Sequence, residues 1–353
     1  MTEHFPILIL LVPLFGALIV VLLGRERPEQ CWVTSLVSLG ISSIISLFTI
    51  IVVLSDKVQT IRYRMGGWEP EANGYEVGIE LRVDILAALV VFAVTFVGFV
   101  NTIYSKTRAE AEVQGKVSFF YALIQLLIVG LCGIVMTNDA FNLYVLIEIT
   151  SLTSYALIAM GNRRAALSSF NYVIMGTIGA SFYLLGVGYL YIKTGTLNID
   201  DIRMVLGDNN LWDHQSIIVA FIFIMLGVWT KMAFFPLHGW LPNAYAYAPS
   251  MTGTFMAPLM TKVMVYVMIR VMIWLFGHEF VYSGQHVWGE LIIWMSVLAI
   301  VAGSLLALAR TDIKKMLTYL IVAEVGYMVG GAWLGNVTGQ AGAFYHILSD
   351  AAM

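Results

Sequence analysis

The sequence predicts an all-α fold: a polytopic bundle of transmembrane helices with inverted-topology five-helix repeats and one proline-broken helix. Three observations predict it. Hydrophobic residues make up 59% and charged residues 12% of the 353, where charged residues are roughly a quarter of a soluble domain, so lipid must be the main solvent. Apolar runs of bilayer-spanning length recur along the chain. Two prolines, Pro236 and Pro242, interrupt one of these runs.

Eleven membrane-spanning helices are expected, taken in chain order. They cover residues 5–23, 32–54, 83–104, 117–136, 139–160, 166–192, 215–247 with an interruption, 251–276, 287–309, 314–334 and a last span from 339. The first span has Glu3 and His4 before it instead of basic residues, which favours a retained helix over a signal peptide. Segment 55–82, which contains Gly66, Pro70 and Gly74, is predicted to be an exposed loop.

Lysine and arginine in short loops predict the orientation. The loops after odd-numbered helices carry Arg25, Arg27, Lys106, Arg108, Lys116, Arg163, Arg164, Arg310, Lys314 and Lys315. Those after even-numbered helices carry few basic residues. We therefore expect the amino terminus outside and the odd loops in the cytoplasm, in the cell inner (cytoplasmic) membrane.

A weak internal repeat predicts the organisation of the chain. Segment 117–160 has Asp139 in a turn and Glu148 in the following helix, and 287–334 has Asp312 and Glu324 in the same places. Their opposite predicted orientation is typical of transporters built from inverted repeats. We expect three regions: three N-terminal helices in 1–104, a first repeat unit in 117–276 with its broken helix at 215–247, and the start of a second unit in 287–353.

The most informative residues are the few ionisable ones near helix centres, where one charge costs about 2.5–3.5 kcal/mol on insertion scales. They are Glu148, Lys231, Lys262, Glu324, His346 and Asp350. Such residues usually mark ion or proton routes. The alternative is a buried pair that only fixes helix packing. Asp139 and Asp312 are predicted to cap helices, and Lys193 and Arg270 to extend to the membrane surface.

The broken span is the second informative feature. Lys231 precedes Pro236, and His238 stands between the two prolines. A helix broken at membrane depth is stable only where protein or a hydrated cavity satisfies the freed backbone. In transporters such breaks point to the ion site.

Several classes of site are not indicated. Cys31 and Cys132 form no CxxC pair, and no histidines have metal-ligand spacing, so we expect no metal and no cofactor. A formal net charge of -3 does not favour nucleic-acid binding.

From these residues the sequence resembles the antiporter-like membrane subunits of three kinds of assembly: multisubunit cation:proton antiporters (their D-type component), NADH:quinone oxidoreductases (their M- and N-type components) and membrane-bound hydrogenases. The resemblance is strongest in 142–155 and 227–270. Gly66-Gly67-Trp68 and the segment 78–84 look most like the antiporter branch.

The resemblance implies that Glu148, Lys231, Lys262 and His346 form a hydrated, charged line along the middle of the membrane, supported by His238 at the break. Two positions depart from the family pattern: Glu324 replaces a small or polar residue or histidine, and Asp350 stands where histidine is frequent. Such proteins have about fourteen helices, so we expect this sequence to be truncated, split or incomplete.

The predicted function is proton translocation by one subunit of a sodium/proton antiporter, in which Lys231 carries an exchangeable proton and Glu148 sets its affinity. The alternative is a proton-pumping membrane-arm subunit of an NADH:quinone oxidoreductase or a membrane-bound hydrogenase. In that case the redox chemistry belongs to other subunits, because this chain shows no redox or hydrolytic site. A third possibility is a non-conducting structural piece. The expected partners are other membrane subunits, protons, sodium and lipid.

Overall fold

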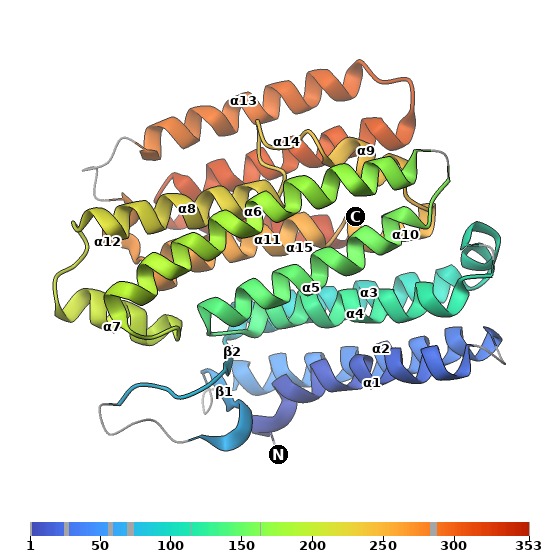
Figure 1. Ribbon diagram of the computed structural model, residues 1–353, viewed down its shortest axis with the longest axis horizontal. Coiled ribbons are helices and arrows are strands. Elements are labelled where there is room, and N and C mark those ends of the chain that lie inside the picture. Colours follow the sequence, from blue (N-terminus) through green and yellow to red (C-terminus); the bar gives the residue numbers. More distant parts are fainter. Residues whose placement is uncertain are drawn as a thin grey trace.

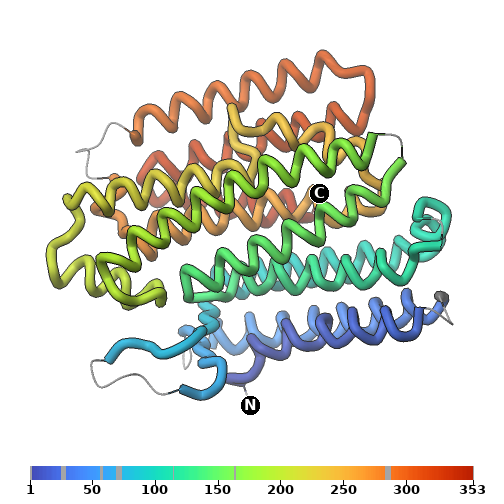
Figure 2. The backbone as a smooth tube through the Cα atoms, in the orientation of Figure 1, coloured from blue at the N-terminus to red at the C-terminus, as the bar shows by residue number. Residues whose placement is uncertain are grey.

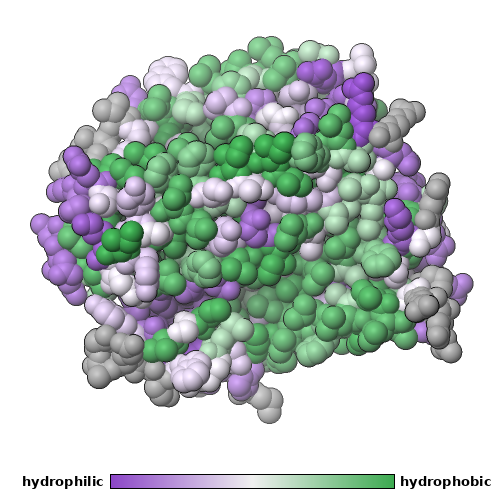
Figure 3. Space-filling model, in the orientation of Figure 1, coloured by the Kyte–Doolittle hydropathy of each residue, from purple (hydrophilic) through white to green (hydrophobic). Residues whose placement is uncertain are grey.

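The computed structural model describes residues 2–24, 28–55, 59–68, 74–113, 115–162, 164–282 and 288–352. Four residues named above, Arg25, Arg27, Pro70 and Arg163, lie outside this part of the chain. Within the described residues, nine helices are long and apolar enough to cross a membrane. Apolar side chains cover the middle of one face, and hydrophilic ones gather toward the two ends (Figure 3). The chain is a multi-pass membrane protein.

Of the three N-terminal helices, the first two form one edge of the bundle and the third lies farther in (Figure 1). After a single turn, η1 (Thr2–His4), they are α1 (Phe5–Leu23), α2 (Pro28–Leu54) and α3 (Ile85–Val113). Helix α4 (Val117–Met136) packs against all three. Buried side chains join α2 to α4: Ser38 donates to Gln125 Oε1 over 2.5 Å, and Gln125 Nε2 donates to Ser35 over 3.0 Å.

The remaining spans agree closely with the predicted ranges. They are α5 (Ala140–Ala159), α6 (Ala165–Thr194), α8 (Gln215–Lys231) with α9 (Leu241–Tyr247), α10 (Ser250–Met256) with α11 (Met260–Arg270) and the π-helical turn η3 (Val271–Leu275), α13 (Trp288–Leu308), α14 (Ile313–Trp333) and α15 (Val337–Ala352). Asp139 and Asp312 cap α5 and α14, as predicted, by accepting hydrogen bonds from backbone amides. The α4–α5 and α13–α14 turns lie at opposite ends of the bundle (Figure 2), as the inverted orientation requires.

The span predicted as continuous over 251–276 is interrupted between α10 and α11. Pro258 causes the interruption, because proline has no amide hydrogen and its ring clashes with the carbonyl four residues earlier. That carbonyl belongs to Thr254, and it accepts a hydrogen bond of 2.6 Å from Asn101 Nδ2 on α3. No role was predicted for this proline from the sequence.

The prediction of an exposed loop over 55–82 was wrong where two strands form, although residues 65–68 are exposed. The chain forms an antiparallel hairpin of β1 (Ile61–Arg64) and β2 (Glu80–Val83), with η2 (Met65–Gly67) after β1. Two short helices, α7 (Ile199–Asp208) and α12 (His278–Tyr282), complete the described elements. We call the end of the bundle that carries β1 and β2 the hairpin end.

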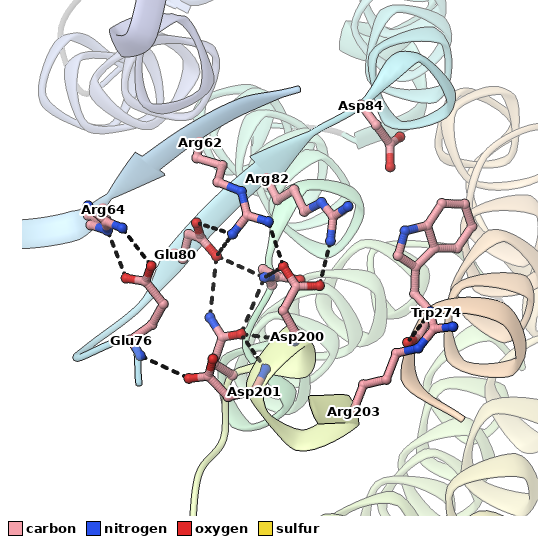
Figure 4. A network of polar contacts seen from close by, with 12 residues as sticks. Arg62, Arg64, Glu76, Glu80, Arg82, Asp84, Asp200, Asp201, Arg203 and Trp274 are labelled. Carbon is pink, nitrogen blue, oxygen red and sulfur yellow. Dashed lines mark hydrogen bonds and ion pairs between the residues drawn. The ribbon is translucent and has the colours of Figure 1, made fainter. Parts of the chain in front are cut away.

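A polar network fixes the hairpin to α7 (Figure 4). Glu80 is buried and accepts hydrogen bonds from Arg62, Asn138 and Asn198 at 3.1, 2.8 and 3.3 Å. Asp200 pairs with both Arg62 and Arg82. Because a charge-assisted hydrogen bond is stronger than a neutral one, this network anchors the hairpin firmly.

Acidic groups are crowded at the same place. Burial raises the pKa of Asp201 above its usual range, although the hydrogen bond from the Glu76 backbone amide opposes the shift. The negative charges of Glu76, Asp200 and Glu80 add to the increase.

Arg270, which was predicted to extend to the membrane surface, is largely buried and paired within the protein. Its guanidinium is ion-paired with Asp84, which lies just before α3, and stands 4.4 Å from the ring of Trp274. The arginine therefore ties the end of α11 to the start of α3. Lys193 is exposed and contacts His214.

The network predicts that Glu80→Ala lowers the stability of the folded protein. Glu80 is buried, and its removal leaves the amide donors of Asn138 and Asn198 without this acceptor, which costs about 1–3 kcal/mol. Thermal unfolding of the purified protein in detergent measures the effect. Glu76→Ala, between the two strands, is the matched control, because its carboxylate pairs with Arg64, whose side chain is 39% exposed, and pairs near the surface contribute roughly 0–1 kcal/mol. Equal losses in the two variants would contradict the anchoring role of Glu80.

Candidate functional site

The first buried ion pair joins α8 to α5. Lys231, the last residue of α8, donates hydrogen bonds to Glu148 Oε1 over 3.2 Å and to Ser151 Oγ over 2.7 Å. The lysine side chain is 4% exposed and the glutamate side chain 25%. The ammonium lies at the carboxyl end of α8, where the helix dipole stabilises a cation. The structure therefore brings together two of the residues predicted from the sequence, from positions 83 residues apart.

The helix is broken directly after Lys231. Ala233 adopts a left-handed backbone with φ of 58°, and the helical path resumes only at α9. Pro242 lies in the first turn of α9, where a missing amide hydrogen costs nothing. The break frees the carbonyl of Thr230, which accepts a hydrogen bond of 3.1 Å from Trp240 Nε1. Lipid has no hydrogen-bond donor for this carbonyl, and the indole of Trp240 provides one.

Stacked aromatic rings connect this break to the ion pair. Trp240 lies flat on Tyr172, with ring centroids 3.9 Å apart, and Tyr172 meets Tyr155 edge-on at 4.7 Å. Tyr155 belongs to α5, two turns after Glu148. The stacked rings thus connect the segment between α8 and α9 to the helix that carries the carboxylate.

Gly176 on α6 makes room for this arrangement. A Cβ atom at this position would stand 1.9 Å from the hydroxyl of Tyr155 and 3.4 Å from Lys231 Nζ. The absence of a side chain here lets α6 approach the pair closely.

The second buried lysine lies on α11, near the other interrupted helix. Lys262 Nζ is 3.0 Å from Glu324 Oε2, 3.4 Å from the carbonyl oxygen of Ala257 and 3.6 Å from Asp350 Oδ2. Its side chain is 4% exposed. Lys262 is the third residue of α11, where the helix dipole disfavours a cation. Its stability there depends on the two carboxylates.

His346 completes the second group. Its Nε2 lies 3.5 Å from Asp350 Oδ1, one turn later on α15, and its ring meets Tyr327 at 6.2 Å. We call Lys262, Glu324, His346 and Asp350 the second-lysine cluster. Within the described residues, no hydrogen bond or ion pair joins this cluster to the Glu148–Lys231 pair.

The other predicted site residues play supporting parts in the geometry. Pro236 follows Phe235 through a cis peptide bond. His238 stacks on Phe235 at 5.3 Å and faces Tyr319 at 6.4 Å. In the part of the chain that the structure describes, His238 does not contact either lysine by a hydrogen bond. Among the residues that the structure describes, no group of three or more His, Cys, Asp or Glu residues is placed to hold a metal ion.

Sequence reasoning missed several residues of the site. Ser151 could have been found, because it lies three residues after Glu148 and so shares its helix face. Trp240 and Tyr172 gave no signal, because their contacts join segments far apart in the chain.

A cavity of about 550 Å³ lies apart from both lysines, at the hairpin end. Glu76, Asp139, Asn142 and Asn198 are among its lining residues. It contacts α5 from Asp139 to Val145, and Val145 lies three residues before Glu148, about 5 Å along a helix. Neither Glu148 nor Lys231 is among its lining residues, so the cavity is a polar depression next to the ion pair and not the site of the pair itself.

Comparison with protein families gives a match over most of the chain. The family described as NADH:quinone oxidoreductase/Mrp antiporter, TM, matches residues 137–353. The matched range contains both lysines and all four acidic and histidine residues that surround them.

Two curated relatives are similar over nearly all of this chain. It is 40% identical to the N component of the NADH-quinone oxidoreductase of Desulforudis audaxviator, covering 99% of this chain and 68% of that protein. It is 29% identical to the D component of the Na(+)/H(+) antiporter of Bacillus subtilis, covering 99% and 67%. The chain thus spans about two thirds of the length of both relatives.

Two solved structures share the fold. A chain of the membrane-bound sulfane sulfur reductase, an archaeal respiratory membrane complex, superposes with a TM-score of 0.88 at 28% identity, covering 98% of this chain and 68% of that one. A chain of the Mrp complex from Dietzia sp. DQ12-45-1b gives 0.85 at 21% identity, covering 99% and 63%. The second likeness shows the fold alone.

The close approach at Gly176 predicts that Gly176→Ala destabilises the site. The new methyl group would force Tyr155 or α6 to move, and overpacking of this kind costs about 1–3 kcal/mol. Gly188→Ala, on the same helix, is the matched control, because nothing lies within 4 Å of its Cβ position. Thermal unfolding of both variants checks the prediction. A loss of stability in Gly188→Ala equal to that in Gly176→Ala would contradict it.

Proposed function

The chain belongs to the NADH:quinone oxidoreductase/Mrp antiporter transmembrane family, and we propose on this premise that it moves protons through its two buried lysine sites. One observation supports the proposal above all. Each lysine is 4% exposed, stands beside an interrupted helix and is held by a carboxylate from another helix. Ionisable groups inside membranes are costly and are typical of proton relays.

In the proposed mechanism, Lys231 carries an exchangeable proton and Glu148 sets its affinity. With the pair closed, the carboxylate and Ser151 stabilise the ammonium. With the pair separated, an ammonium in a water-poor site is uncompensated, and it gives up its proton more readily. The aromatic stack from Trp240 to Tyr155 links the break in the helix to the separation of the pair.

The second-lysine cluster is proposed to receive the proton or respond to its release. Lys262, Glu324 and His346 are the groups that take part. Lys231 and Met264 of α11 line one narrow gap, so the two lysine sites are neighbours across that helix. Helix movement at the breaks would open this gap to water and connect the sites.

The same geometry supports an assembly with other membrane subunits. Glu148 and Glu324 are 25% and 32% exposed within their helices, where contact of a carboxylate with lipid is unfavourable. Protein or water must therefore cover both groups. The relatives named above belong to antiporters and respiratory complexes, and we propose that this chain also works within such a complex.

Two driving forces are candidates for the coupling. Exchange of sodium for protons is supported by the likeness to the Bacillus subtilis antiporter relative and by the loop motif at Gly66. Redox-driven pumping is supported by the 40% identity to the Desulforudis audaxviator oxidoreductase relative. The higher identity favours the redox-driven complex, with electron transfer in other subunits. We further propose that the amino terminus faces the outside of the cytoplasmic membrane.

Replacement of Lys231 tests the proton route. In everted vesicles that contain the whole complex, Lys231→Ala is expected to reduce proton translocation at least tenfold, because Lys231 carries the exchangeable proton in the proposed mechanism. Quenching of a pH-sensitive dye measures the rate. Lys193→Ala, which removes an exposed lysine, is expected to keep the normal rate.

The charge on Glu148 is tested separately. Glu148→Gln keeps the shape of the side chain but removes its charge, so it is expected to reduce translocation, while Glu148→Asp retains part of the rate. Normal rates in both Lys231→Ala and Glu148→Gln would overturn the proposed function.

The driving force is tested with the same vesicles. A sodium gradient applied without any electron donor moves protons if the complex is an antiporter. NADH or another electron donor is required if the complex is redox-driven, and sodium alone is then without effect. We expect the second result.

A further inference from the structure

We propose that His346 and Asp350 share one exchangeable proton beside Lys262, and that loss of this proton moves the Lys262 ammonium from Glu324 to Asp350. The inference rests on the proposed function and adds a proton-holding site to it. Asp350 thereby becomes part of the route itself and not only its surroundings.

The first observation is the burial of Asp350 without a hydrogen-bond donor. Its side chain is 3% exposed, and among the described residues no donor meets the geometry of a hydrogen bond to either carboxylate oxygen, while the carboxyl group of Glu324 lies close enough to interact with it. Nε2 of His346 is likewise buried and without a partner there. Buried polar atoms are nearly always satisfied, so each such group requires an explanation. A proton shared by the two side chains provides one.

The second observation is the balance of charge. The cluster contains two carboxylates and one ammonium. With a neutral histidine its net charge is one negative unit, in a site where an uncompensated charge is unfavourable. The amino-terminal end of α11 offers roughly half a positive charge and offsets only part of it. One additional proton neutralises the cluster.

The additional proton is held by the histidine and the aspartate as a pair. Either an imidazolium faces a carboxylate, or a neutral imidazole faces a carboxylic acid. Both forms are neutral and bind the same number of protons, so they behave as one titrating unit. The distance of 3.5 Å from Nε2 to Oδ1 lets a small side-chain rotation form the hydrogen bond.

The third observation is the position of Lys262 between two carboxylates. Its ammonium bonds Glu324 at 3.0 Å and stands 3.6 Å from Asp350. While the shared proton is present, Glu324 carries the only uncompensated negative charge, and the ammonium stays with it. When the proton leaves toward water, Asp350 becomes an isolated anion and attracts the ammonium. No bond other than that to the departing proton is broken.

Among the described residues, the helices packed on α15 bring no charged group to the cluster besides its own members. Helix α14 presents Glu324 and the ring of Tyr327, and α11 presents Lys262 and, near Phe344, Tyr266. Helix α3 also packs on α15. Among the described residues, none of its ionisable groups makes an ion pair or hydrogen bond with the cluster.

The Glu148–Lys231 pair has no comparable arrangement of a second carboxylate and a histidine. Lys231 has one carboxylate, Glu148, and a neutral hydroxyl, Ser151, as partners. That pair is neutral as it stands and offers the ammonium no second anion. The two lysine sites therefore differ in what they can store: the first holds the proton of the lysine, and the second holds one more.

Infrared spectroscopy tests the proposal on the whole complex in lipid, labelled with ¹³C at the aspartate carboxyl group. Spectra recorded across a pH titration are expected to show one ionisation that involves a labelled aspartate and a histidine. Asp350→Asn should remove it, and His346→Gln should alter its midpoint. Asp350→Glu should restore an ionisation that no longer carries the aspartate label. Asp312→Asn, which replaces an exposed helix cap, should leave this ionisation unchanged, although the signal of Asp312 itself disappears.

Glu324→Gln gives the sharpest result. Removal of this negative charge balances the cluster without the extra proton, so the midpoint of the ionisation should move to lower pH. A purely structural role for Glu324 predicts no such shift. An Asp350→Asn spectrum identical to that of the unaltered protein, or an unchanged midpoint in Glu324→Gln, overturns the proposal.

This titration is made at equilibrium and does not require translocation. A missing ionisation together with inactive Lys231→Ala vesicles would refute only the shared proton. A normal ionisation together with active Lys231→Ala vesicles would refute only the proposed function.

Discussion

Lipid offers no hydrogen bonds, and this constraint determines where helices can be broken in this protein. Each of its two interrupted spans exposes backbone carbonyls that other parts of the chain must satisfy. Trp240 caps Thr230 at the first break, and Asn101 of a distant helix caps Thr254 at the second. The breaks are stable because these partners exist, and each break places a lysine next to irregular backbone. The two lysine sites therefore depend on the same helix breaks that these hydrogen bonds stabilise.

The two lysines occupy opposite ends of their helices, and this explains their different surroundings. Lys231 ends α8, where the dipole favours a cation, and one carboxylate is enough to hold it. Lys262 begins α11, where the dipole opposes a cation, and it lies near two carboxylates. A site with one carboxylate is balanced when closed. A site with two is balanced only with a further proton, and is therefore sensitive to its protonation.

The hairpin end of the bundle is held together by hydrogen bonds and ion pairs. Glu80 ties the hairpin to residues before α5 and α7, and Asp84 ties the start of α3 to Arg270 at the end of α11. Lys262 lies about two turns from Arg270 on the same helix. The Arg270 end of α11 is held by an ion pair, and Lys262 lies toward the opposite end, where Pro258 interrupts the span.

The sequence by itself determined that lipid surrounds the protein, where the spans lie and where the intramembrane charges stand. Hydropathy and the effect of proline on a helix are both local properties of the chain. The sequence located the break after Lys231 and the caps at Asp139 and Asp312 correctly. The partner of each charge was decided only by the tertiary structure. Nothing in local sequence could show that Lys262 lies between Glu324 and Asp350, or that Trp240 caps the first break, because such contacts depend on how helices distant in sequence are placed side by side.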